Sequence, residues 1–175
     1  MRLTRANQAG MTIMDLIVSI GIFALLASTM IANFRGGARS EGVRQASRLT
    51  ESLLRRAQTM TLSGSVLANG DYPDGGYGVR FDISQAGKIF LFSDVNGNFR
   101  YDINEIIAEN DVLFPNNTTF SLAENLDVVF SPPDGDVYFN GAALPDTKII
   151  SFIADGTDQA NQITIYRLSG QIRVE

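Results

Sequence analysis

The sequence predicts an α+β fold, in which a long N-terminal helix packs on a C-terminal antiparallel β-sheet domain. Charged residues are missing from Leu16 to Phe34, and from Ser63 onward short apolar runs alternate with Gly, Pro, Asn and Asp. The length of 175 residues allows one ordinary domain plus a terminal segment. An apolar share of 45% is typical of globular proteins, so the sequence does not predict wholesale disorder.

Residues 11–34 are predicted to form a transmembrane helix. The uncharged stretch from Leu16 to Phe34 contains 19 residues. A helix needs roughly 20 residues to cross the hydrocarbon core of a bilayer. A spanning helix that begins near Thr12 is therefore the simplest interpretation.

A secretory signal peptide is the alternative interpretation of this segment. It would use Arg2 and Arg5 as its basic start and small residues such as Ala27 and Ser28 near a cleavage point. Asp15 at the head of the apolar run argues against it, because a signal peptide gains nothing from a carboxylate there. The run also exceeds the usual apolar region of a signal peptide by about one helical turn.

Residues 35–64 are predicted to form an amphipathic helix that packs on the β domain. Apolar residues recur there at steps of three and four, which places them on one helical face: Val43, Ala46, Leu49, Leu53, Ala57 and Met60. No proline separates this segment from the apolar run, so one helix of about 50 residues is possible. Gly36, Gly37 and Gly42 predict a bend or a locally melted segment.

Residues 65–175 are predicted to form the β-rich globular domain. Seven apolar runs have the length and composition of strands: 77–83, 88–94, 127–131, 136–139, 148–154, 163–168 and 171–175. The last two are joined at Ser169 and Gly170, where a tight hairpin turn needs a positive φ. We therefore expect an antiparallel sheet that covers the apolar face of the amphipathic helix.

Composition disfavours most enzyme classes and nucleic acid as the main partner. The chain has no Cys and no His, which removes thiolate chemistry and the commonest general base. We therefore expect no catalytic residues and no enzymatic activity. Net charge is -5, which does not suit a nucleic-acid-binding surface. The arginines between Arg35 and Arg56 alternate with Glu41 and Glu51, which favours a solvated helix face over a surface for lipid headgroups or nucleic acid.

The N-terminal run AGMTIMDLIVSIGIFALLAS resembles the type IV pilin and type II secretion pseudopilin superfamily. In that family a short basic leader ends in Gly, a prepilin peptidase cuts after it, and the new N-terminus is methylated. The resemblance implies a pilin-like fold, a leader over residues 1–10, cleavage between Gly10 and Met11, and N-methylation of Met11. This chain has Met11 and Asp15 where the family has Phe and Glu.

The resemblance also implies a role for Asp15 in subunit assembly. A carboxylate inside a spanning helix costs at least ~2.5 kcal/mol on insertion scales and therefore needs a partner. In assembled pili this carboxylate is thought to pair with the N-terminal ammonium of a neighbouring subunit. The alternative is a carboxylate at the membrane interface that simply reaches the headgroups.

The rest of the chain resembles minor pilins and H-type minor pseudopilins, in LTESLLRRAQTMTLSGS, GYGVRF, IFLFSDVNGNFRYDINEII and ITIYRLSGQIRV. This implies a structural subunit of a type IV pilus or type II secretion pseudopilus. Its partners would be other pilin or pseudopilin subunits, the prepilin peptidase, the inner-membrane assembly platform and the lipid bilayer. The alternative function is a membrane-tethered extracytoplasmic binding module for calcium, a glycan or a surface ligand.

The resemblance further implies a single-pass protein of the inner (cytoplasmic) membrane that later enters the filament. Its β domain would be extracytoplasmic. The positive-inside rule favours the opposite orientation. Two arginines precede the apolar run, Arg2 and Arg5, and four follow it between Arg35 and Arg48. We follow the resemblance, because cleavage of the leader requires it.

One loop has the residue spacing of a calcium site. Five oxygen-bearing residues occupy positions 1, 3, 5, 9 and 12 of an EF-hand-like loop: Asp94, Asn96, Asn98, Asp102 and Glu105. The sixth position of such a loop requires Gly, and this chain has Phe99 there. The alternative is a hairpin loop in which the Asp and Asn side chains bond to local backbone.

Overall fold

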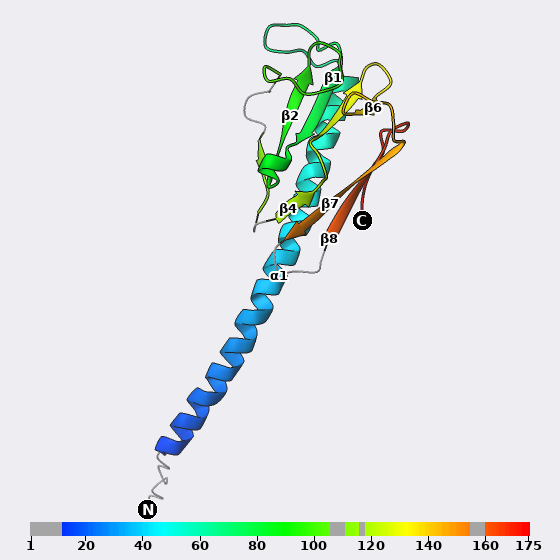
Figure 1. Cartoon of the computed structure of the whole chain (residues 1–175). Coiled ribbons are helices and arrows are strands. Elements are labelled where there is room, and N and C mark those ends of the chain that lie inside the picture. Colours follow the sequence, from blue (N-terminus) through cyan, green and yellow to red (C-terminus); the bar gives the residue numbers. More distant parts are fainter. Residues whose placement is uncertain (1–11, 106–110, 116–117, 155–159) are drawn as a thin grey trace, which may run out of the picture. The chain divides into compact units, whose positions relative to one another are not determined.

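The computed structural model describes residues 12–105, 111–115, 118–154 and 160–175, without the side chains of 32–36 and 39. The chain divides into two compact units, Met1–Gly37 and Ala38–Glu175. Helix α1 (Ile13–Leu62) contributes residues to both of them (Figure 1). The fold class is α+β, as predicted.

Helix α1 takes in most of both predicted helical segments, 11–34 and 35–64, from Ile13 to Leu62. Its helical backbone includes Gly36, Gly37 and Gly42. No melted segment separates the two halves, so that part of the prediction is wrong. The expected leader, residues 1–10, lies outside the described residues.

Two antiparallel sheets make up the described β structure of the second unit. The five-stranded sheet has the order β3-β2-β1-β5-β6, and the four-stranded sheet has the order β4-β7-β8-β9. The bounds are β1 (Gly76–Phe81), β2 (Lys88–Asp94), β3 (Val112–Leu113), β4 (Thr118–Ser121), β5 (Leu126–Ser131), β6 (Asp136–Phe139), β7 (Thr147–Ala154), β8 (Ala160–Tyr166) and β9 (Ile172–Val174). A short 3₁₀ helix, η1 (Ile83–Gln85), joins β1 to β2. All seven predicted strands are confirmed, whereas β3, β4 and the division into two sheets were not predicted.

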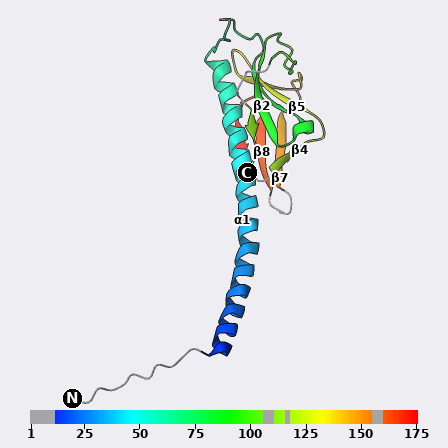
Figure 2. The same cartoon turned by 90° about the vertical axis from the view of Figure 1, so that its left-hand side faces the viewer.

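The core of this unit lies between the two sheets and α1 (Figure 2). Four of the six residues predicted on the apolar helix face are buried, namely Val43, Ala46, Leu53 and Ala57. Leu49 and Met60 are half-buried. The predicted orientation of this part of the helix is therefore confirmed.

Hydrogen bonds join α1 to both sheets. The buried Thr61 hydroxyl donates to Phe130 O in β5 at 3.1 Å and accepts from Tyr77 N in β1 at 2.9 Å. Gln58 Nε2 donates to Gly170 O in the β8–β9 turn at 3.2 Å. The predicted hairpin is confirmed, and Gly170 has a φ of 59° there. The positive φ favours glycine here, and a Cβ at this position would also displace the Gln58 amide, which lies 2.6 Å away.

Candidate functional site

The apolar part of α1, Ile13–Ile31, is long and apolar enough to cross a membrane. It contains 19 residues with a mean hydropathy of 2.1, and none of it is buried. Large side chains stand open to the surroundings, with Phe23 and Met30 each 71% exposed. This much contiguous apolar surface requires a bilayer or other apolar helices around it. Length and composition support a single-pass anchor, and a signal sequence has the same two properties.

Asp15 forms the N-terminal cap of this helix together with Thr12. Thr12 Oγ1 accepts a hydrogen bond from Asp15 N at 3.2 Å, and Asp15 Oδ2 accepts from Thr12 N at 3.1 Å. The Thr12 hydroxyl also donates to Asp15 Oδ2 at 2.8 Å. This reciprocal arrangement is a capping box, which satisfies two backbone donors that helix geometry leaves unpaired. The other oxygen, Oδ1, accepts no hydrogen bond from a described residue, and Gly10 and Met11 lie outside the described residues.

The 94–105 loop is built around two buried carboxylates. Asp94 accepts three backbone hydrogen bonds, from Gly97 N at 2.9 Å, Asn98 N at 3.2 Å and Phe99 N at 2.6 Å. Glu105 accepts from Val95 N at 3.0 Å and from Asp102 N at 2.8 Å. Burial raises the pKa of both carboxyl groups, and these backbone donors act in the opposite direction.

Two neighbours fix the shape of this loop. Phe99 adopts a left-handed backbone with a φ of 57°, which is unusual for a bulky residue. Its ring stacks on that of Tyr138 at a centroid distance of 4.0 Å, and this contact offsets the conformational cost. Gly75 packs directly against the Asp94 carboxylate, where any side chain would collide with it. Asp94 is thus enclosed by backbone on several sides.

The five predicted calcium ligands belong to one hydrogen-bonded loop, and each of them already accepts at least one hydrogen bond. Asp102 Oδ2 accepts from Asn96 Nδ2 at 2.7 Å and from Asn98 Nδ2 at 2.9 Å. The amide oxygens of both asparagines accept backbone N–H groups. Within the described ranges, no group of three or more acidic side chains is arranged to hold a metal ion. Calcium binding stays a prediction, and it would require these hydrogen bonds to exchange for metal contacts.

A buried ion pair joins this loop to the five-stranded sheet. Arg80 and Asp127 face each other across β1 and β5, and Arg80 Nη1 donates to both carboxylate oxygens at 2.9 and 3.2 Å. Tyr101 N donates to Asp127 Oδ2 at 3.1 Å, and the Tyr101 ring lies 4.7 Å from the guanidinium carbon of Arg80. None of these three residues was predicted as important. The strands of Arg80 and Asp127 were predicted, but only the register of β1 against β5 shows that these two residues form an ion pair.

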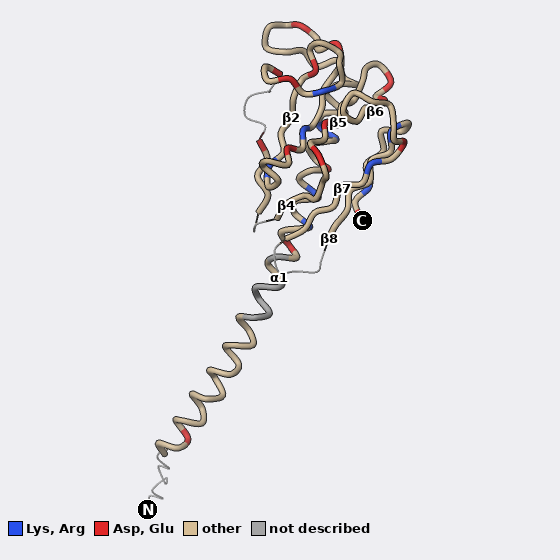
Figure 3. The backbone as a smooth tube through the Cα atoms, viewed as in Figure 1, with Lys and Arg blue, Asp and Glu red and all other residues tan. Residues whose placement is uncertain are grey.

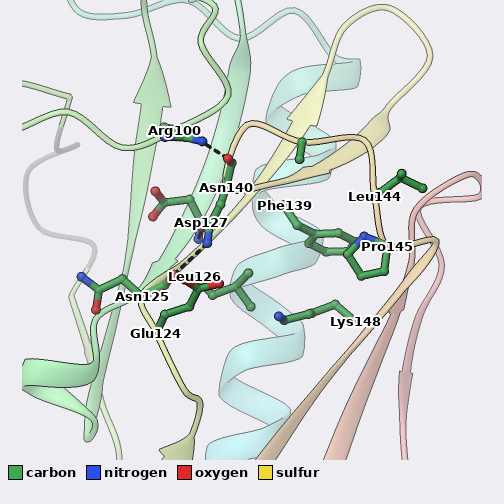
Figure 4. A pocket seen from close by; sticks show the side chains of 11 residues that line it. Arg100, Glu124, Asn125, Leu126, Asp127, Phe139, Asn140, Leu144, Pro145 and Lys148 are labelled. Atoms are coloured by element: carbon green, nitrogen blue, oxygen red, sulfur yellow. Dashed lines mark hydrogen bonds between the residues drawn. The ribbon is translucent and has the colours of Figure 1, made fainter.

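A polar cavity of about 480 Å³ opens beside this ion pair (Figure 4). Arg100 Nε donates to Asn140 O at 2.7 Å on one side of it. Lys148 extends from β7 on the other side, and no hydrogen bond or ion pair holds it within the part of the chain that the structure describes. Phe139 and Pro145 form an apolar part of the cavity wall. The lining of the cavity therefore combines polar and apolar groups, and no sequence motif indicated it.

The chain matches no protein-family model, no curated protein and no solved structure.

Proposed function

We propose that this protein is a structural subunit of a filament, a minor pilin or pseudopilin of the type IV pilus or type II secretion kind. The exposed apolar helix Ile13–Ile31 with a carboxylate in its first turn is the observation that carries the proposal. Such a surface fits a bilayer before assembly and the apolar helices of neighbouring subunits afterwards. The compact unit with a buried core, residues 38–175, would be the globular part of such a subunit.

The proposed assembly begins with removal of the leader. The prepilin peptidase would cut between Gly10 and Met11, and the new amine of Met11 would then be methylated. That ammonium would pair with Asp15 of a neighbouring subunit, through the oxygen that the capping box leaves open. Pairing replaces two desolvated charges by one satisfied pair.

The proposed location follows from the same steps. Before assembly the chain would cross the inner membrane once, with its β-rich part on the extracytoplasmic side. Afterwards it would lie in the filament and depend on the assembly platform and on other pilin or pseudopilin subunits.

Mass spectrometry of the mature protein and a matched pair of variants test this proposal. We expect a chain that begins at methylated Met11, and a chain that begins at Met1 or after Ser28 would contradict the proposal. Asp15→Ala should abolish incorporation into filaments. Thr12→Ala is the control, because it breaks the capping box but keeps the carboxylate. Equal loss in both variants would show that Asp15 acts only as a cap.

The polar cavity supports a second candidate, a membrane-tethered extracytoplasmic binding module. In this case the apolar helix is only an anchor, and the β-rich unit recognises calcium, a glycan or another surface ligand. The free Lys148 amine and the apolar wall give the cavity the mixed character of small-molecule sites. Intact leader residues in the mature chain would favour this candidate over the filament subunit.

A further inference from the structure

Charge is divided unevenly between the second half of α1 and the β-rich part. Residues 35–62 contain six Arg and two Glu, a net charge of +4. Residues 63–175 contain six Lys or Arg and 16 Asp or Glu, a net charge of -10. The overall charge of -5 conceals this separation.

Three arginines of α1, here called the arginine face, have no ion-pair partner among the residues that the structure describes. Arg44, Arg48 and Arg56 are exposed, and no described residue forms an ion pair or side-chain hydrogen bond with them. Arg55 differs, because its Nη2 lies 2.7 Å from Glu51 Oε1 and also donates to Ile172 O. The arginine face thus presents three guanidinium groups with all their donors open.

Three loops form an acidic end around the C-terminus of α1: 63–75, 94–105 and 131–136. Tyr72 donates its hydroxyl hydrogen to Thr61 O at 2.8 Å, and Gly135 packs against Leu62. Figure 3 shows acidic residues gathered in the loops at this end of the unit. Four carboxylates of these loops are exposed and form no ion pair with a described residue, namely Asp71, Asp74, Asp102 and Asp134. Arg100 is the single basic residue in the three sequences.

We propose that the acidic end of one copy binds the arginine face of a second copy that is displaced along the axis of α1. This inference rests on the proposed function, which supplies parallel neighbouring subunits. Two parallel copies in register would oppose arginine to arginine and carboxylate to carboxylate, which is repulsive. Displacement brings opposite charges together instead.

The positions of the arginines set the size of the displacement. Arg56 and Arg44 precede Leu62 by 6 and 18 residues. At 1.5 Å of rise per residue these separations correspond to about 9 and 27 Å along the helix. An offset within these limits places an acidic loop of one copy beside an arginine of the next. Charge therefore selects a staggered association and disfavours an in-register one.

Crosslinking in membranes tests the contact on the full-length chain, which contains no native cysteine. Cells would produce two copies together, one with Arg48→Cys and the other with Asp74→Cys, before treatment with a bismaleimide. We expect crosslinks between these two positions to exceed 48–48 and 74–74 crosslinks several-fold. The yield should fall as salt rises, because exposed charges are screened beyond about 8 Å at physiological ionic strength. Equal yields for all three combinations would overturn the proposal.

Charge reversal makes the test specific. Arg44→Glu and Arg56→Glu in the first copy should lower the crosslink yield several-fold. Asp71→Lys and Asp134→Lys in the second copy should then restore it. If the crosslink yield is not restored, the proposal is wrong. This result is also expected if the arginines contact lipid phosphates and not a second copy. The substituted residues are exposed, so we expect all variants to fold. Protease resistance of the membrane-bound chain measures whether they do.

A Ser28→Cys pair separates this proposal from the proposed function. Ser28 lies in the apolar helix, so its crosslinking reports helix association directly. Crosslinks at Ser28 without any between positions 48 and 74 would refute the staggered charge contact and leave the filament subunit standing. Absence of both would refute both proposals.

Discussion

Apolar side chains are exposed in the first segment of α1 and buried in the second. Between Ile13 and Ile31 they stand outward on every side of the helix, and none of that segment is buried. Between Val43 and Ala57 they lie on one face, where Ala46, Leu54 and Ala57 are fully enclosed by the sheets. The second segment therefore gains stability within its own chain, whereas the first must find its apolar partners outside it.

Carboxylates show the reverse of this pattern. In the apolar segment the one acidic residue, Asp15, is exposed at the helix start. In the β-rich unit Asp94, Glu105 and Asp127 are buried, and each is matched to backbone N–H groups or to Arg80. Burial of charge is tolerated because every such group has its partners built in. One oxygen of Asp15 accepts no hydrogen bond from the described residues.

The largest expected effect contrasts two leucines of the same helix. Leu54→Ala should destabilise the β-rich unit by about 4 kcal/mol, because it opens a cavity in a core where Leu54 is fully buried. Leu25→Ala, at a position 66% exposed, should leave the stability of that unit unchanged. Chemical denaturation in detergent, followed by tyrosine fluorescence, measures both. Equal effects would contradict the division between the two segments.

The next effect concerns the buried ion pair. Asp127→Ala should cost about 3 kcal/mol, because it leaves the guanidinium of Arg80 buried without its counter-charge. The double variant Arg80→Met with Asp127→Leu should recover part of this loss. Together with the single variants Arg80→Met and Asp127→Leu, the same denaturation assay gives the coupling energy through a double-mutant cycle. Additive effects would mean that the two residues act independently.

A smaller effect is expected in the pH dependence of stability. Burial raises the pKa of Glu105 above its usual 4.5, so the folded state binds a proton more readily than the unfolded state. This contribution is complete below pH 4.5 and is lost as the pH rises through the raised pKa. Glu105→Gln does not titrate at this position, so wild type should lose stability relative to this variant between pH 4 and pH 7, measured with a chelator present. A constant stability relative to Glu105→Gln, or a gain by wild type, would contradict the raised pKa.

Local sequence patterns predicted much of this fold because their causes are local. The helix face from Val43 to Met60 and the β8–β9 hairpin follow from residue period and turn chemistry. The capping box was not predicted, although the pattern Thr12-x-x-Asp15 is visible in the sequence. β4 was missed because Thr118–Ser121 is short and mostly polar.

Features that depend on strand register could not be predicted in this way. Arg80 and Asp127 are separated by 47 positions in the chain and meet only because β1 and β5 are neighbours in one sheet. The cavity likewise combines Arg100, Asn140 and Lys148 from separate elements. Neither spacing nor composition marks such a set before the sheets are assembled.

The smallest expected effect is that of calcium on the 94–105 loop. Asp94 and Glu105 already accept backbone N–H groups, and Asp102 accepts the side-chain amides of two asparagines. Added calcium should therefore leave the melting temperature and the heat of titration unchanged. Asp94→Asn is the informative variant, because it turns an acceptor of the Phe99 N–H group into a donor and should destabilise the loop without any metal. A rise in melting temperature with calcium that this variant abolishes would establish the predicted calcium site. The loop carboxylates would then resemble Asp15, because they too would need a partner from outside the chain. The apolar segment of α1 and the β-rich unit would then differ less in how their carboxylates are paired.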